Sequence, residues 1–202
     1  MKIVAQALSK RFTLREWVFK DLNFEFNQGC KYGISGPNGS GKSTLMSILS
    51  GINLPSKGSL QYYNDKLLIE PMQWYKFISI ATPYSDIIDY LTLDELIDFY
   101  LQFKSFQKKL NKEDFLQIVY LKEQRNKFIK HFSSGMKQRL KLGLAILSDS
   151  DVLFLDEPGT NLDDQALDWY YDLLNKNTVD KLVVVASNEK RDFISCNDII
   201  EL

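Results

Sequence analysis

Ten residues near the start of the chain, GPNGSGKSTL, combine backbone freedom, a cation and hydroxyl groups in one short segment. Gly36, Gly41, Lys42 and Ser43 fit the spacing G-x-x-x-x-G-K-[ST] of a phosphate-binding loop. Glycines let backbone N–H groups wrap around a phosphate chain, and a helix N-terminus adds a positive dipole end. We expect Lys42 to reach the β and γ phosphates of a nucleotide and Ser43 to bind Mg²⁺. The residues expected to contact the nucleotide here are Gly36, Pro37, Asn38, Gly39, Ser40, Gly41, Lys42, Ser43 and Thr44.

The sequence on either side of this loop separates a phosphate site from its alternative, a glycine-rich turn that only joins two elements. Residues 30–35, CKYGIS, are typical of a strand, and STLMSILSG places apolar residues at helical spacing. Gly51 is a suitable stop for that helix. A strand before the loop and a helix after it are the context that a phosphate loop requires, so nucleotide binding is favoured.

A pair of carboxylates follows a second apolar run, VLFLDEP. Asp156 ends the predicted strand, where it can hold Mg²⁺ through its water shell, and Glu157 is a candidate general base for water. Adjacent carboxylates after a buried strand could instead cap a helix. Because a phosphate loop is present in the same chain, the magnesium and general-base roles are the better interpretation.

The elements that must position these residues follow an α/β rhythm. Alternating runs at 2–8 and 22–26 indicate strands with one buried face. The continuous apolar runs VLFL and LVVV are typical of strands covered on both faces, which predicts a mostly parallel sheet with crossover helices. Between these parts, residues 84–131 carry helical spacing, with Thr92 and Asn111 placed as N-caps.

Composition restricts the class of protein. The 202 residues suit one domain, and 45% hydrophobic with 25% charged residues is ordinary for a folded globular chain. A net charge of -1 gives no overall attraction for nucleic acid. Cys30 and Cys196 have no metal-binding or redox spacing, so we expect reduced structural thiols and a cytoplasmic chain without a signal peptide or membrane span.

A third segment, FSSGMKQRLKLGLAIL, lies between the phosphate loop and VLFLDEP. It resembles the LSGGQ-x-Q-R signature of the ATP-binding subunits of ATP-binding-cassette (ABC) transporters, with matches at Ser133, Gly135, Gln138 and Arg139. The order of motifs resembles that family over essentially the whole chain. The resemblance implies an α/β P-loop NTPase core with a mostly parallel sheet, an N-terminal antiparallel β part and a helical subdomain at about 84–135. All of these would belong to a single ABC ATPase domain spanning 1–202.

The resemblance also implies a shared site. In this family two subunits enclose two ATP molecules head to tail, so Ser133, Ser134 and Gly135 would contact the γ-phosphate held by the partner's loop. Taken alone, SSG would be a helix cap. Phe12 sits where the family has an aromatic residue that stacks on adenine, with a buried core phenylalanine as its alternative. Asp163, in GTNLDD, takes the acidic position of the D-loop, a role compatible with capping the next helix.

Two positions depart from the family pattern. Pro83 replaces the usual glutamine that contacts Mg²⁺ and the attacking water, and proline offers no side-chain oxygen. Asn188 replaces the usual histidine at the γ-phosphate, so it can donate a hydrogen bond but cannot carry imidazole's charge or shuttle a proton. The lone histidine, His131, is expected to be an exposed polar residue.

These observations support one leading hypothesis and two alternatives. The leading one is an ATPase subunit, with Lys42, Glu157 and Asn188 as catalytic residues, Ser43 and Asp156 as magnesium ligands, and ATP and Mg²⁺ as cofactors. Its expected partners are a second ATPase subunit, in a homodimer, and a separate integral membrane subunit that keeps it at the inner face of the membrane. One alternative is a nucleotide-gated regulatory subunit with little hydrolysis. A soluble ABC ATPase acting on nucleic acid lacks support.

Overall fold

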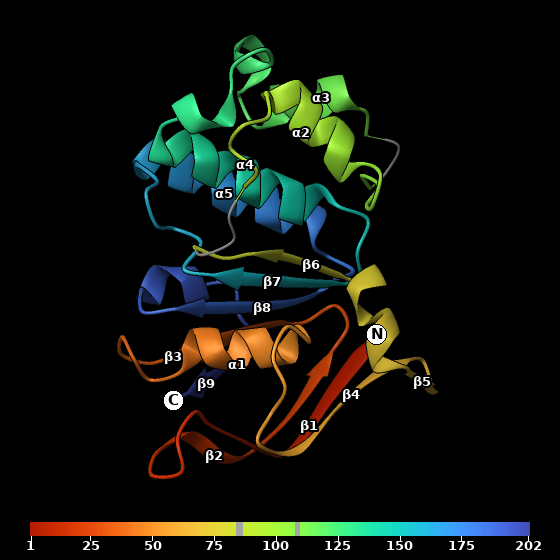
Figure 1. Cartoon of the computed structure of the whole chain (residues 1–202), viewed down its shortest axis with the longest axis vertical. Helices are drawn as coiled ribbons and strands as arrows, with labels where there is room; N and C mark the ends of the chain where they lie inside the picture. The colour runs from red at the N-terminus through yellow and green to blue at the C-terminus, as the bar shows by residue number, and fades with distance from the viewer. Residues whose placement is uncertain (84–86, 108–109) are drawn as a thin grey trace.

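The described part of the chain, residues 1–83, 87–107 and 110–202 of a computed structural model, contains two sheets and a cap of helices. One sheet has four strands in the order β2-β1-β4-β5, and its pairings are antiparallel. The other has five parallel strands in the order β6-β7-β8-β3-β9. Figure 1 shows the parallel sheet between the helical cap above and the antiparallel sheet below.

The elements have the following bounds. The strands are β1 (Lys2–Arg11), β2 (Trp17–Asn27), β3 (Lys31–Ser35), β4 (Lys57–Asn64), β5 (Leu67–Ile69), β6 (Ile78–Ala81), β7 (Val152–Asp156), β8 (Leu182–Ser187) and β9 (Asp198–Glu201). The α-helices are α1 (Lys42–Leu49), α2 (Leu93–Tyr100), α3 (Lys112–Ile118), α4 (Ser134–Leu147) and α5 (Asp164–Asn177). Short 3-10 helices cover Pro71–Lys76, Lys122–Gln124, Ile129–His131 and Lys190–Phe193.

The centre of the parallel sheet is buried on both faces, as the continuous apolar runs predict. Every residue of β7 and β8 is buried. Leu153 and Val183 pack in the core shared with α4 and α5, whereas Phe154 and Val184 pack in the core shared with α1. This alternation follows from the period of two along a strand. The sheet is therefore held between helices on both sides, with its carboxyl ends left for the loops that carry chemistry.

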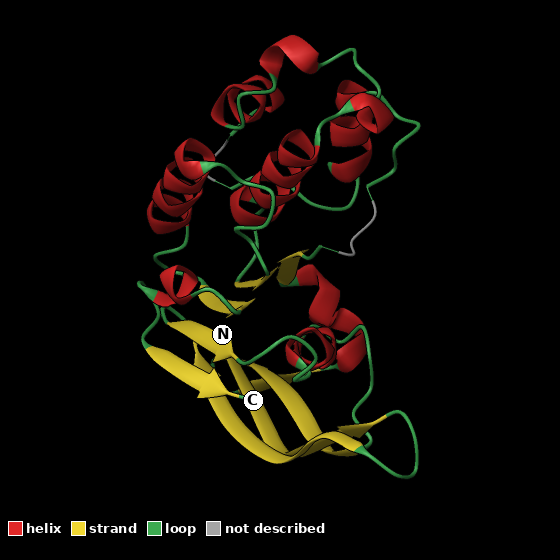
Figure 2. Ribbon diagram, turned by 90° about the vertical axis from the view of Figure 1, so that its left-hand side faces the viewer, coloured by secondary structure: helices red, strands yellow, loops and turns green. Residues whose placement is uncertain are grey.

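The helical part begins with well-formed caps. Thr92 and Asn111 each form a capping box with the acidic residue three positions on, which confirms both predicted N-caps. Figure 2 shows the helices of this part gathered at one end of the molecule, with the strands at the other. The expected boundary of the subdomain, at residue 84, lies outside the described residues, so that boundary stays a prediction.

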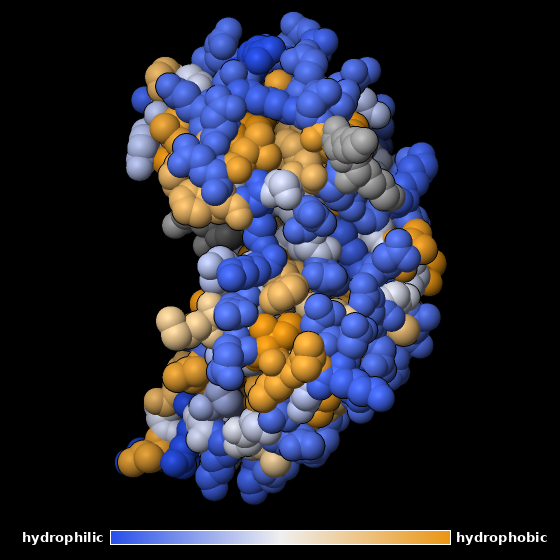
Figure 3. Space-filling view, turned by 90° about the vertical axis from the view of Figure 1, so that its right-hand side faces the viewer, coloured by the Kyte–Doolittle hydropathy of each residue, from blue (hydrophilic) through white to orange (hydrophobic). Residues whose placement is uncertain are grey.

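The surface of the molecule carries several apolar side chains among its polar groups. Figure 3 shows one side of the molecule, where hydrophilic groups cover much of the surface and apolar groups gather in separate patches. Leu67 and Leu68 of β5 and Met72 of the following 3-10 helix are exposed. Among the described residues, no helix has the length and apolar character needed to traverse a bilayer. Both cysteines are free.

Candidate functional site

The phosphate loop connects β3 to α1, which begins at Lys42 as predicted. Gly39 and Gly41 have φ angles of 86° and 104°, in the left-handed region that favours glycine. Lys42 is only 6% exposed, and its ammonium donates hydrogen bonds to the carbonyl oxygens of Gly36, at 2.7 Å, and Pro37, at 3.3 Å. The lysine is thereby held over the loop whose N–H groups would receive phosphate.

Asp156 ends β7 beside the phosphate loop and is only 2% exposed. Its Oδ1 atom is buried without a hydrogen-bond partner, and the Ser43 hydroxyl lies near its carboxylate. Burial raises the pKa of Asp156, while the nearby Ser43 hydroxyl and the charge of Lys42 partly offset that effect.

The donor set at Asp156 and Ser43 fits Mg²⁺. An orphaned carboxylate oxygen next to a hydroxyl supplies two hard oxygen ligands, and phosphate oxygens and water are the other ligands that Mg²⁺ prefers. In the stretches that the structure describes, no three His, Cys, Asp or Glu side chains gather into a metal-binding group. A magnesium ion here would therefore depend on the nucleotide for the rest of its ligands.

Glu157 follows Asp156 in a left-handed conformation, with a φ of 47°. Its Oε1 lies 3.7 Å from the ammonium of Lys42. Partial burial raises the pKa of Glu157, an effect that the Lys42 charge opposes and the neighbouring Asp156 reinforces. The carboxylate thus lies within reach of the cation that would hold the phosphates, where it can accept a proton from water.

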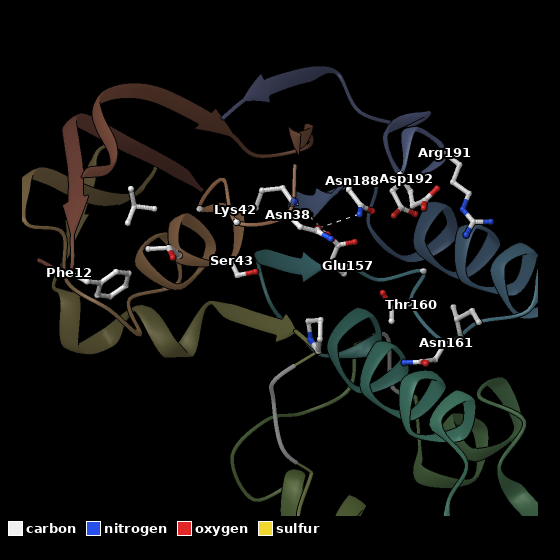
Figure 4. A pocket seen from close by; sticks show the side chains of 18 residues that line it. Phe12, Asn38, Lys42, Ser43, Glu157, Thr160, Asn161, Asn188, Arg191 and Asp192 are labelled. Carbon is white, nitrogen blue, oxygen red and sulfur yellow. Dashed lines mark hydrogen bonds and ion pairs between the residues drawn. The ribbon is translucent and has the colours of Figure 1, made fainter. Parts of the chain in front are cut away.

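These residues border a pocket of about 950 Å³. Figure 4 shows Phe12 at one end of it, Lys42, Asn38 and Glu157 in the middle, and Arg191 and Asp192 toward the other end. The ring of Phe12 is 69% exposed, which excludes a buried core role and leaves a ring face for stacking. The pocket lining consists of Phe12, Val18, Asn38, Gly39, Gly41, Lys42, Ser43, Thr44, Pro83, Glu157, Gly159, Thr160, Asn161, Leu162, Asn188, Glu189, Arg191 and Asp192.

Both residues that depart from the family pattern line this pocket. Pro83 contributes its ring, and its carbonyl oxygen accepts a hydrogen bond from Lys141 at 3.1 Å. Asn188 donates from Nδ2 to Oδ1 of Asn38 at 3.4 Å, the dashed line in Figure 4. Asn188 therefore lies against the phosphate loop, and its contact with a γ-phosphate stays a prediction. His131 is exposed, as expected.

The SSG segment lies outside this pocket. Ser133 caps α4 by accepting a hydrogen bond from the backbone N–H of Met136 at 3.2 Å. A Cβ on Gly135 would lie 3.3 Å from the carbonyl oxygen of Asn161, so SSG and the loop after β7 are neighbours. Asp163 caps α5 through the N–H of Ala166 at 2.8 Å. The structure thus bears out the capping roles and leaves the γ-phosphate contact a prediction.

Five polar residues of the pocket were not named as site residues from the sequence. Thr160 and Asn161 belong to the GTNLDD segment after β7, where only Asp163 was singled out, and Glu189, Arg191 and Asp192 follow β8. The three residues after β8 belong to no short motif with a defined spacing. Their signal was positional, since each lies a few residues beyond the carboxyl end of a buried strand.

The family of the chain is shown by direct comparison. A family model described as ABC transporter matches residues 19–160, which is more than half of the chain. The chain belongs to the ABC transporter family. An uncharacterized ABC transporter ATP-binding protein of Bacillus subtilis, YybJ, is 31% identical over 189 residues, covering 90% of this chain and 84% of YybJ. These relationships identify the chain as the ATP-binding part of an ABC transporter.

Other relatives of this ABC cassette are longer. ATP-binding cassette sub-family A member 6 of Homo sapiens is 29% identical over 188 residues, but the chain spans only 12% of that protein's length. A second Bacillus subtilis ATP-binding protein, YcbN, is 32% identical, and the chain spans 52% of its length. A solved dimeric ATP-binding cassette in a post-hydrolysis state, bound to ADP and Pi, superposes with a TM-score of 0.84 at 23% identity. That match covers 99% of this chain and 94% of the other, and it shows the P-loop NTPase fold of ABC cassettes.

The burial of Asp156 predicts a stability gain from removing its charge. Burial raises the pKa of this carboxyl above its ordinary value of about 3.9. At a pH between the ordinary pKa and the raised pKa, the folded chain therefore binds more protons than the unfolded chain. The stability contributed by the protonated carboxyl is therefore lost toward neutral pH. We expect Asp156→Asn to raise the free energy of unfolding at pH 7, measured by urea titration, and to raise it less at pH 4. A gain that grew on acidification would contradict this account.

Proposed function

We propose that this ABC cassette binds Mg²⁺–ATP, hydrolyses it, and powers a membrane transporter through closure of a dimer on the nucleotide. One observation carries the proposal. Lys42, Asp156 and Glu157 meet beside a glycine loop, so that a cation, a buried metal-type carboxylate and a base-type carboxylate share one site. A structural turn would have no need for an orphaned carboxylate oxygen beside a buried lysine.

The pocket suits an elongated nucleotide. The base would stack on Phe12 at one end, and the phosphates would lie along the loop toward Glu157. Lys42 and the loop amides would hold the phosphates, while Ser43 and Asp156 would hold Mg²⁺, which neutralises developing charge on the γ-phosphate. Glu157 would accept a proton from the attacking water. Asn188, beside Asn38, would offer a hydrogen bond where the family has a histidine.

Dimer closure is supported by the position of SSG. Ser133, Ser134 and Gly135 stand at the start of α4, where hydroxyl and N–H groups are available to an anion, yet they do not line the chain's own pocket. A second copy could present this helix start to the nucleotide. The solved relatives that share the fold include cassettes described as dimeric.

A membrane partner is also part of the proposal. YybJ and YcbN, of whose lengths the chain spans 84% and 52%, are described as ABC transporter ATP-binding proteins, and no helix among the described residues could cross a membrane. We propose that this chain acts from the cytoplasmic face through a separate integral membrane subunit.

The alternative is a nucleotide-gated regulatory subunit with little hydrolysis. It is favoured by Pro83 and Asn188, which line the pocket in place of a glutamine and a histidine. Glu157 argues against it, because a subunit that only binds nucleotide has no need of a base near the phosphates.

Single-turnover hydrolysis of Mg²⁺–ATP by the purified chain tests the proposal and separates these functions. We expect the wild type to release phosphate, and Asn188→His to do so at a similar rate. A slow wild type and a variant faster by about 100-fold or more, the lower end of what a positioned acid–base group contributes, would favour the regulatory subunit. Failure of both proteins to release phosphate would refute the enzymatic proposal.

A further inference from the structure

A buried carboxylate that the proposed mechanism does not use lines the same pocket as Glu157. Asp192 is only 3% exposed, and it comes from the 3-10 helix that follows β8. Its Oδ1 accepts a hydrogen bond from the hydroxyl of Tyr171 on α5 at 2.9 Å. Its Oδ2 accepts one from the hydroxyl of Ser187, the last residue of β8, at 2.6 Å. A buried carboxylate with two such donors is held in a fixed position.

Ser187 stands between two carboxylates. Its Oγ is 2.6 Å from Oδ2 of Asp192 and 3.4 Å from Oε2 of Glu157. A serine hydroxyl has one hydrogen, so it can donate a full hydrogen bond to only one of these acceptors. The two distances show which acceptor receives it, because 2.6 Å is typical of a strong O–H···O⁻ bond and 3.4 Å is beyond the usual range.

The surroundings keep this arrangement in place. The Ser187 oxygen also accepts a hydrogen bond from the backbone N–H of Glu189 at 3.0 Å. On the other side of Asp192, a Cβ added to Gly159 would lie 3.6 Å and 3.8 Å from its carboxylate oxygens, so the loop after β7 packs against this group. Asp192 therefore contacts the loop after β7, the end of β8 and α5, and Ser187 links it to the candidate general base; Figure 4 shows Asp192 beside Arg191 on one side of Glu157.

We propose that Asp192 is a positioning residue that accepts the hydrogen bond of the Ser187 hydroxyl and so keeps this serine from donating to Oε2 of Glu157, where it would compete with water. This inference rests on the proposed function, in which Glu157 accepts a proton from the attacking water. A serine that donated a hydrogen bond to Glu157 would stabilise its deprotonated carboxylate and would compete with water for the carboxylate lone pairs. Asp192 prevents that competition by offering a stronger acceptor at shorter distance.

If Asp192 acts in this way, a second substitution at Ser187 should restore the turnover that is lost when Asp192 is replaced. In Asp192→Ala the hydroxyl of Ser187 loses its acceptor and is free to turn to Glu157. We expect kcat for ATP to fall about 10-fold, the size of one hydrogen bond to a charged group, with the KM for ATP unchanged within about twofold. Adding Ser187→Ala to this variant removes the competing donor, so turnover should recover at least about fivefold.

Two further variants make the test independent of folding. Tyr171→Phe removes the other donor to Asp192 and leaves the Ser187 bond intact, so we expect kcat within about twofold of wild type. Asp192→Leu, alone and with Ser187→Ala, repeats the comparison with the branched shape and the number of side-chain heavy atoms kept and no acceptor offered. Thermal unfolding of each protein shows whether it folds.

The outcomes divide clearly. A double variant no faster than Asp192→Ala would overturn the inference, because a merely structural role for Asp192 predicts added damage from a second substitution. An Asp192→Ala protein with wild-type kcat would overturn it as well. If the wild-type turnover itself did not depend on Glu157, the proposed function would fail instead, so the two failures are distinguishable.

Discussion

Replacing Lys42 with alanine should reduce ATP turnover at least about 100-fold, the loss that follows removal of one preorganised donor to developing charge. The ammonium is held at 2.7 Å from the Gly36 carbonyl oxygen and 3.7 Å from Glu157, with almost no exposure to water. A charge in such a site interacts strongly with phosphate because little solvent screens it. Steady-state phosphate release at saturating Mg²⁺–ATP, together with nucleotide binding by fluorescence, measures the effect.

Exposed lysine provides the matched control for this variant. Lys66 lies in the turn between β4 and β5, away from the pocket lining, so Lys66→Ala should keep wild-type turnover. Thermal unfolding without nucleotide tests whether Lys42→Ala remains folded. Unchanged ATPase activity in a folded Lys42→Ala protein would refute the assignment of the phosphate loop.

Replacing Glu157 with glutamine should lower kcat by about 100-fold to 10,000-fold, the contribution of a general base, while ATP binding is retained. Glutamine keeps the size of the side chain and can still contact Lys42, but it cannot take a proton from water. Since the γ-phosphate then persists, the closed form that depends on it should accumulate. Gel filtration with and without Mg²⁺–ATP checks this, and the expected result is an ATP-dependent shift to dimer.

The control for Glu157→Gln is a carboxylate near the same surface that the mechanism does not use. Glu189 lines the pocket without contacting Lys42 in any described ion pair, so Glu189→Gln should keep turnover within about threefold of wild type. A Glu157→Gln protein that turned over ATP at the wild-type rate would remove the general-base role. If it lost turnover but stayed monomeric with ATP, dimer closure by the isolated chain would be refuted.

The motifs were predictable because each rests on a local physical requirement. The phosphate loop needs glycine at positive φ and a helix start at Lys42, and both are present where the spacing places them. The caps at Thr92 and Asn111 follow from side-chain hydrogen bonds over three residues. The buried strands β7 and β8 follow from uninterrupted apolar runs.

Contacts between segments that are distant in the sequence could not be predicted from local spacing. No spacing rule joins Ser187 to Asp192 and Tyr171, since the hydroxyl of Tyr171 reaches this group from another element, α5. Phe12 likewise allowed two interpretations, core or surface, until its exposure was known. Such questions depend on how elements pack, and packing is set by the whole set of side chains.

Residue types and short spacings were enough to predict the chemical groups of the candidate site: a phosphate loop, a carboxylate pair after a buried strand, the SSG segment and the departures at Pro83 and Asn188. These are properties of residue type and short spacing, which backbone geometry converts directly into local structure. The packing of the elements was needed to show which groups share the pocket, that SSG lies outside it, and that Ser187 donates to Asp192 rather than Glu157. A hydrogen bond is decided by differences of less than an ångström, and only the packed arrangement of strands and helices fixes positions that closely.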